Sequence, residues 1–145
     1  MMANVPLPSS YLKVETLPTR VLLVDDCESV RDWLKAVLES KGYQIDGEAA
    51  CGKEGVALAL RLQPDVVLMD FQMPRLNGLA AAKEILRELP ATRVIILTTY
   101  ADRGDVREGL RIGIRGFAPK TGKAEDVLRA ISQVLTGETY VGPGF

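Results

Sequence analysis

The feature that most constrains the fold is the form of residues 65–70, where four consecutive apolar residues stand between two aspartates. The run Arg20–Val24 has a similar form and is followed by Asp25 and Asp26. A strand that is apolar at successive positions is buried on both faces, which is typical of the centre of a parallel sheet covered by helices. The two runs therefore predict an α/β fold whose central strands carry acids at their carboxyl ends.

The rest of the chain alternates between short apolar runs and helical stripes. Val30, Trp33, Leu34, Val37 and Leu38 recur with the three-and-four spacing of an amphipathic helix. By the same criteria we expect strands at residues 20–24, 43–49, 65–70, 94–97 and 114–118, and helices at 30–41, 52–62, 79–89, 102–111 and 127–135. Strands that alternate with helices are typical of a doubly wound parallel sheet, here with five strands and five helices.

Composition limits the function classes. A chain of 145 residues is long enough for one ordinary domain and short for two. The net charge of -1 gives no electrostatic reason to expect nucleic acid or an anionic membrane as a partner of this segment. The chain has no histidine, which excludes histidine catalysis and histidine metal ligands, so its chemistry rests on carboxylates, hydroxyls and lysines.

Boundaries and location follow from the less regular segments. Residues 1–19 carry three prolines without an apolar period and are expected to be a mobile arm; residues 20–137 form the domain, and 138–145 a tail or the start of a linker. The arm lacks the apolar core of a signal peptide, and no run is long enough to span a membrane. With two cysteines outside any C-x-x-C pair, a cytoplasmic location is expected.

Polar residues gather at one predicted edge of the sheet. Asp25 and Asp26 follow the first strand, Asp70 ends the third, Thr98 ends the fourth and Lys120 follows the fifth. Ligands of open parallel sheets bind at the carboxyl ends of the strands, where three converging carboxylates need a counter-charge. Mg²⁺ favours oxygen ligands and keeps several waters, so one or two carboxylates suffice to hold it. With Mg²⁺ present, Asp70 could act as a nucleophile toward phosphorus, and Lys120 and Thr98 could receive the phosphoryl charge.

These residues, together with the Met69-Asp70-Phe71-Gln72-Met73-Pro74 segment and the Asn77-Gly78 pair, resemble the motifs of response-regulator receiver domains of two-component signalling. The match runs from about residue 20 to residue 137. The resemblance implies a flavodoxin- or CheY-like fold with strand order 2-1-3-4-5. It also implies that a sensor histidine kinase supplies the phosphoryl group.

The resemblance assigns a role to each matching position. Asp70 corresponds to the phosphoacceptor, and Asp26 and Asp70 to direct ligands of Mg²⁺. Asp25 corresponds to a water-mediated ligand, and the main-chain carbonyl of Gln72 to a third protein ligand. Two further roles concern signalling. Thr98 and Phe117 resemble a coupled switch pair, in which the hydroxyl moves toward the phosphoryl group and the aromatic ring turns inward. Gln72 and Tyr100 occupy variable positions that tune the loss of the phosphoryl group.

Two outputs remain open. Residues 109–117 and 137–141 resemble the LuxR/NarL/FixJ-like branch, which carries a C-terminal helix-turn-helix domain. That branch implies transcription regulation, a homodimer on phosphorylation, and DNA contact only through an output domain outside these 145 residues. The alternative is a stand-alone receiver that acts in a phosphorelay or by protein contact.

Two other function classes were weighed. A Mg²⁺-dependent phosphohydrolase needs an acid two residues after its nucleophile, and Gln72 stands there. A degenerate receiver would lack motif residues that are all present here. We therefore expect no enzyme, apart from Mg²⁺-dependent self-phosphorylation and autodephosphorylation at Asp70.

Overall fold

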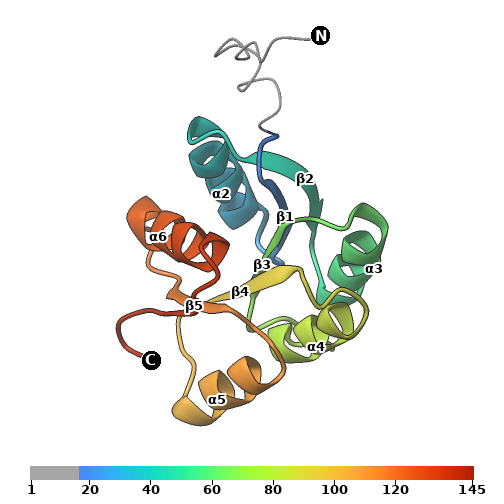
Figure 1. Ribbon diagram of the computed structural model, residues 1–145, viewed down its shortest axis with the longest axis vertical. Helices are drawn as coiled ribbons and strands as arrows, with labels where there is room; N and C mark the ends of the chain where they lie inside the picture. Colours follow the sequence, from blue (N-terminus) through green and yellow to red (C-terminus); the bar gives the residue numbers. More distant parts are fainter. Residues whose placement is uncertain (1–16) are drawn as a thin grey trace, which may run out of the picture.

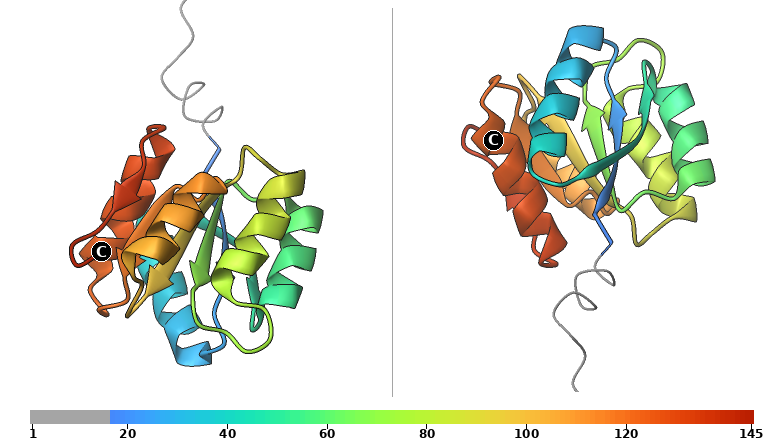
Figure 2. Two further views of the ribbon diagram at one scale, coloured as in Figure 1. Left: turned by 90° about the horizontal axis from the view of Figure 1, so that it is seen from below. Right: turned by 90° about the horizontal axis from the view of Figure 1, so that it is seen from above.

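The computed structural model describes residues 17–145 and has a parallel sheet between two layers of helices (Figure 1). Helices α2 and α6 cover one face, and α3, α4 and α5 cover the other, as the views from below and above also show (Figure 2). The expected N-terminal arm, 1–19, lies almost entirely outside the described residues. Within them, no helix is long and apolar enough to cross a membrane.

Strands and helices alternate along the chain as predicted. The elements are β1 (Arg20–Val24), α2 (Glu28–Ser40), β2 (Gln44–Ala49), α3 (Gly52–Leu62), β3 (Val66–Asp70), α4 (Gly78–Glu88), β4 (Arg93–Thr98), α5 (Arg103–Arg111), β5 (Gly116–Pro119), α6 (Ala124–Leu135) and β6 (Tyr140–Val141). Two helices begin at side-chain caps that satisfy free backbone N–H groups: Asn77 accepts from Ala80, and Asp102 accepts from Asp105.

The sheet confirms the predicted strand order and corrects the strand count. The order is β2-β1-β3-β4-β5-β6, so the expected 2-1-3-4-5 arrangement gains a sixth strand at its edge. Tyr140 and Val141 form this strand and pair in parallel with β5, inside the segment expected to be a tail or linker. Two residues are too few to show an alternating pattern, which is why the sequence did not reveal the strand.

The core forms on both faces of the central strands. Alternate residues of β1 enter opposite clusters: Leu22 and Val24 pack toward α3, while Val21 and Leu23 pack toward α2 and α6. All four are at most 1% exposed. The prediction that continuous apolar runs form doubly covered strands is therefore confirmed, and their carboxyl ends are held in fixed positions.

Candidate functional site

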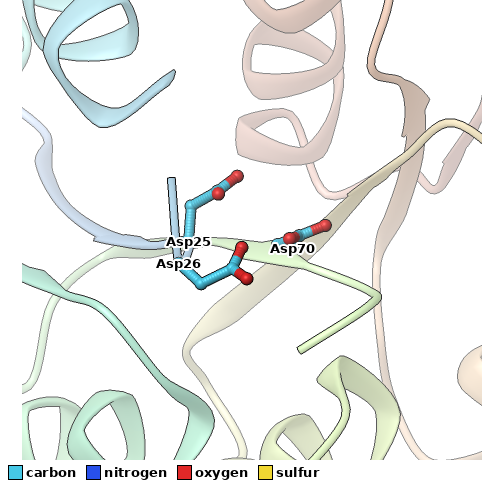
Figure 3. Close-up of side chains that lie close together, drawn as sticks. All are labelled: Asp25, Asp26 and Asp70. Carbon is cyan, nitrogen blue, oxygen red and sulfur yellow. The ribbon is translucent and has the colours of Figure 1, made fainter. Parts of the chain in front are cut away.

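The carboxyl ends of β1 and β3 bring three acids together. Asp25 and Asp26 directly follow β1, Asp70 is the last residue of β3, and these two strands are neighbours in the sheet. One carboxylate oxygen from each aspartate lies within 4.8 Å of one from each of the others, and Figure 3 shows the three side chains gathered at the strand ends. Residues 44 positions apart thus form one acidic cluster, as the sequence predicted.

Asp25 is the most enclosed member of the cluster, with 2% of its surface exposed. Its Oδ1 accepts a hydrogen bond from the backbone N–H of Cys27 at 2.9 Å. Its Oδ2 is buried and forms an ion pair with the ammonium of Lys120 at 2.7 Å. Both oxygens of this buried carboxylate therefore have a partner, one a backbone N–H and the other an ammonium.

Lys120 also contacts Asp70, with its Nζ 3.4 Å from Asp70 Oδ2. Burial raises the pKa of Asp70 above its ordinary value; the charge of Asp25 adds to this rise and Lys120 opposes it. Burial by itself would lower the pKa of Lys120, but the two carboxylates outweigh it and hold that pKa above its ordinary value. At neutral pH the amine is therefore a fixed positive charge beside two buried acids.

Asp26 differs from the other two acids because it is exposed. It borders a surface depression of about 620 Å³, whose other lining residues include Cys51, Lys53, Arg75 and Leu76. The depression runs from the cluster toward the loop between β3 and α4. Asp26 is the one acid of the cluster among its lining residues.

The charges and atoms of the cluster fit a divalent cation. Three carboxylates and one ammonium leave a formal charge of -2, and every candidate ligand is a hard oxygen atom. Mg²⁺ is bound in proteins by such oxygens, with waters completing its coordination. Asp25, Asp26 and Asp70 are the residues that would hold it.

Gln72 stands at the start of the β3–α4 loop, and its main chain lies beside the cluster. Its backbone N–H contributes a small lowering of the pKa of Asp70, against the larger effect of burial. This places the Gln72 backbone close to the phosphoacceptor candidate. The prediction that its carbonyl binds metal stays a prediction.

Thr98 ends β4 beside Asp70 in the sheet, where the Asp70 position pairs with Leu97. The Thr98 side chain is buried, and its hydroxyl is bonded to the backbone of Tyr100: it donates to the carbonyl oxygen at 2.7 Å and accepts from the N–H at 3.1 Å. The Tyr100 side chain is 66% exposed. The Thr98 hydroxyl is therefore hydrogen-bonded to the backbone of the β4–α5 loop.

Phe117 lies one strand further along, on β5, and is completely buried. Its ring meets the ring of Phe145 edge-on, with centroids 6.5 Å apart. The predicted switch residues Thr98 and Phe117 are therefore both buried on adjacent strands. The sequence did not predict the contact between Phe117 and Phe145, because no pattern in the sequence indicates that the glycine-rich C-terminal residues lie beside β5.

Arg31 is a site residue that the sequence reasoning missed. Its guanidinium donates to the main-chain carbonyl of Asp25 at 2.6 Å and pairs with Glu48 at 3.3 Å. Arg31 lies in α2 and Glu48 in β2, so the pair holds the loop that carries Asp25 against two elements. One feature of the sequence could have drawn attention to Arg31: it is a charged residue next to Val30, where the apolar stripe of its helix begins.

Comparisons with known proteins agree with this geometry. The family model for the response regulator receiver domain matches residues 21–132. The chain is 42% identical over 120 residues to the transcriptional regulatory protein LiaR of Bacillus subtilis, covering 82% of this chain and 57% of LiaR. It is 36% identical over 115 residues to the chemotaxis protein CheY of Thermotoga maritima, covering 79% of this chain and 96% of that protein.

A solved structure shows the same fold. The crystal structure of a LuxR-family two-component response regulator from Aurantimonas sp. SI85-9A1 superposes with a TM-score of 0.81 at 27% identity, covering 88% of this chain and 91% of that one. The chain spans a little more than half the length of LiaR and of other curated transcriptional regulators that it matches. The match to the family model covers most of the chain, including all the acids of the cluster. The chain belongs to the family of response regulator receiver domains.

Proposed function

We propose that this domain accepts a phosphoryl group on Asp70 from a sensor histidine kinase and changes conformation when it does so. The observation that carries the proposal is the geometry of one cluster: three carboxylates within 4.8 Å of one another, with Lys120 Nζ 2.7 Å from Asp25 and 3.4 Å from Asp70. Such a cluster carries excess negative charge until a cation joins it, and it can then hold a phosphoryl group. Residues 20–137 are proposed as the receiver, in agreement with the family match.

The transfer would exchange one bond at phosphorus for another. A carboxylate oxygen of Asp70 attacks the phosphorus of the kinase phosphohistidine, a P–O bond forms and the P–N bond breaks. The electron pair of the broken bond returns to the imidazole nitrogen, and Asp70 becomes an acyl phosphate. The depression that Asp26 borders is the surface beside the cluster on which we propose that the donor docks.

Residues around Asp70 would then bind the transferred group. Lys120 already contacts Asp70 and can pair with a phosphoryl oxygen, which is a charge-assisted contact. Asp25, Asp26, Asp70 and the Gln72 carbonyl are proposed to hold Mg²⁺. When bound, Mg²⁺ supplies positive charge that offsets the carboxylates and the phosphoryl oxygens.

The conformational response is proposed to pass through Thr98. Its hydroxyl is now bonded to Tyr100 and would leave that loop to bond the phosphoryl group. The resemblance implies that the Phe117 ring turns inward at the same time, and in this structure the ring is already completely buried. Tyr100, whose side chain is exposed, is proposed to affect how long the phosphoryl group persists.

Transcription regulation is the output we propose first. The transcriptional regulators LiaR and YxjL of Bacillus subtilis are 42% and 41% identical to this chain, and the chain matches 57% and 55% of their lengths. On this reading the receiver dimerises when phosphorylated, and DNA is bound only through an output domain outside these 145 residues. The second reading, a stand-alone receiver that acts by protein contact, is favoured by the match to nearly all of the Thermotoga CheY protein.

We propose no external substrate. Gln72 stands where a phosphohydrolase would carry an acid, so the chemistry is limited to self-phosphorylation and autodephosphorylation at Asp70. The cytoplasmic location expected from the sequence stays part of the proposal, and no membrane partner is proposed.

The test is incubation of the chain with Mg²⁺ and a small acyl phosphate, read by intact mass. We expect one added phosphoryl group per chain, lost slowly on standing, and no addition without Mg²⁺. Asp70→Asn is the matched control, because it keeps the size of the side chain and removes the nucleophile. An unchanged mass of the unaltered chain, or equal labelling of the control, would contradict the proposal.

A further inference from the structure

The loop between β1 and α2 carries two of the three acids of the cluster. It runs from Asp25 to Cys27. The backbone N–H of Asp25 donates to the carbonyl of Ala49 in β2 at 3.0 Å, and the Asp25 side chain accepts from the backbone N–H of Cys27 at 2.9 Å. Asp26 stands between these two residues and is exposed. The position of its carboxylate therefore depends on how the loop backbone on either side is held.

Arg31 holds this loop from the first turns of α2. Its Nη1 donates to the main-chain carbonyl of Asp25 at 2.6 Å, and its side chain is only 15% exposed. A hydrogen bond from a charged donor is shorter and stronger than one between two neutral groups. The main chain of Asp25 is thus bonded on two sides, through its N–H to β2 and through its carbonyl to α2.

Glu48 keeps the Arg31 guanidinium in this position. Its Oε1 accepts from Arg31 Nε at 3.3 Å, and its Oε2 lies 4.0 Å from the ammonium of Lys35, one turn further along α2. Glu48 belongs to β2, so the contact joins the helix to the strand that also bonds Asp25. Because Glu48 balances the charge of the guanidinium, the nearby acidic cluster retains its net negative charge for a cation.

We propose that Arg31 is a positioning residue of the Mg²⁺ site. Held by Glu48, it fixes the backbone from which the side chains of Asp25 and Asp26 leave the loop, and it thereby sets the affinity for Mg²⁺; this rests on the proposed function. Mg²⁺ demands near-ideal octahedral geometry, so ligands that are free to shift bind it less tightly. Groups that hold the ligands of a metal from outside typically contribute about 10- to 100-fold to its affinity.

Two substitutions of Arg31 separate its contacts from its charge. Arg31→Met removes the guanidinium and keeps most of the apolar stem. Because Arg31 bonds the main chain of a ligand candidate and not a ligand atom, we expect the lower end of the range, about tenfold weaker binding of Mg²⁺. Arg31→Lys keeps the charge, but a single ammonium does not reproduce the planar fork that bonds the Asp25 carbonyl and Glu48 together. Its affinity should lie between those of Arg31→Met and the unaltered chain.

Arg93 offers a matched control. Its Nε donates to the main-chain carbonyl of Val134 at 2.9 Å, so it is also a partly buried arginine that bonds a backbone carbonyl of another element. Arg93 is the first residue of β4, whereas the acidic cluster lies near the strand's last residue, Thr98. Arg93→Met should lower the free energy of unfolding and leave the affinity for Mg²⁺ unchanged.

The experiment is an NMR titration of the full 145-residue chain and its variants with magnesium chloride. The shifts of the Asp26 and Cys27 amide resonances give the dissociation constant without any phosphoryl donor. Urea unfolding of each variant establishes that it is folded under the conditions of the titration. We expect the dissociation constant of Arg31→Met to be about ten times that of the unaltered chain.

Phosphorylation by acetyl phosphate provides a second measurement. The Mg²⁺ concentration that gives half the maximal rate should rise by the same factor in Arg31→Met. The rate at saturating Mg²⁺ should stay close to that of the unaltered chain, because Asp70 and Lys120 are unchanged. Glu48→Ala should weaken Mg²⁺ binding in the unaltered chain and add nothing to Arg31→Met, since residues that act through one contact are not additive.

The outcomes distinguish the inference from the proposed function. Equal dissociation constants for Arg31→Met and the unaltered chain overturn the inference, and so does an equal loss of affinity in Arg93→Met, which would indicate a general loosening of the fold. A lower rate at saturating Mg²⁺ with an unchanged dissociation constant overturns it as well. If Arg31→Met does not fold, the same criteria apply to Arg31→Lys and Glu48→Ala. In all these cases the unaltered chain binds Mg²⁺ and the proposed function stands, whereas a chain that binds no Mg²⁺ overturns both.

Discussion

Lys120→Met is the substitution whose effect on stability follows most directly from the structure. The ammonium lies 2.7 Å from a buried oxygen of Asp25 and 3.4 Å from Asp70. Methionine keeps the length and apolar stem of the side chain but leaves both acids without a counter-charge. Loss of one partner from a buried ion pair costs about 3–5 kcal/mol, and because the Lys120 side chain is 23% exposed we expect the lower end, about 3 kcal/mol, in metal-free protein.

Urea unfolding without divalent cations measures this cost. With a slope of about 2 kcal/mol per M urea, the midpoint should fall by about 1.5 M. Lys83→Met, at an exposed position of α4, is the control and should unfold close to the unaltered chain. A midpoint for Lys120→Met within a few tenths of a molar of the control would refute the reasoning.

The pH dependence of the same difference checks its cause. Without the amine, burial and the charge of Asp25 still raise the pKa of Asp70 in the folded variant. A carboxyl whose folded pKa exceeds its unfolded value destabilises the fold above the folded pKa, and this penalty disappears as the pH falls toward the unfolded value of about 3.9. The stability gap between Lys120→Met and the unaltered chain should therefore narrow as the pH falls from 7 toward 4.

At alkaline pH the stability gap between the two proteins changes because of Lys120 and not because of Asp70. In the unaltered chain the folded pKa of Lys120 is raised, so its stabilising contribution is complete below the unfolded value and is lost as the pH rises through the folded one. The gap should therefore also narrow above a pH of about 10.4, the unfolded value for lysine. If the stability gap between Lys120→Met and the unaltered chain stays constant at both acidic and alkaline pH, the stability lost in the variant comes from packing and not from charge.

Three further predictions follow from the structure. Mg²⁺ should raise the thermal unfolding midpoint of the unaltered chain in a concentration-dependent way, as any ligand of the native state does. Asp26→Asn should need a higher Mg²⁺ concentration for the same rise, and an identical concentration dependence would contradict the assignment of Asp26 as a Mg²⁺ ligand. Phe117→Ala should lower the free energy of unfolding by about 3–5 kcal/mol, because it empties a fully buried ring site, and a loss below about 1 kcal/mol in urea unfolding would contradict the packing described. Asn77→Ala should cost about 1 kcal/mol through loss of the α4 cap, whereas Asn77→Asp should retain most of the stability.

The parts of the fold that were predictable from sequence are those with long, regular patterns. The apolar runs of β1 and β3 identified doubly covered strands, and their terminal acids located the functional edge of the sheet. The fifth strand was expected from residue 114 but begins at Gly116: the backbone N–H of Ile114 is bonded back to Gly109 of α5, and only from Arg115 does the chain bond to its sheet neighbours. An apolar residue at the end of a strand looks the same in the sequence whether or not its backbone pairs with the neighbouring strand.

The parts that were not predictable depend on contacts between distant residues. Arg31 bonds a carbonyl of the β1–α2 loop, and a backbone acceptor leaves no trace in the sequence. Phe145 reaches Phe117 because β6 pairs in parallel with β5 and so brings the last residues of the chain beside that strand. The Thr98 hydroxyl could be placed at the strand end, but its bonds to the Tyr100 backbone depend on the local turn.

The claim on which the account depends is that Asp70, and no neighbouring acid, carries the phosphoryl group. Borohydride reduces an aspartyl phosphate to homoserine, which marks the modified residue permanently for peptide sequencing by mass spectrometry. After treatment with Mg²⁺ and acetyl phosphate, the account predicts homoserine at position 70 and unmodified aspartate at positions 25 and 26. Homoserine at position 25 or 26, or at none of the three, would contradict it.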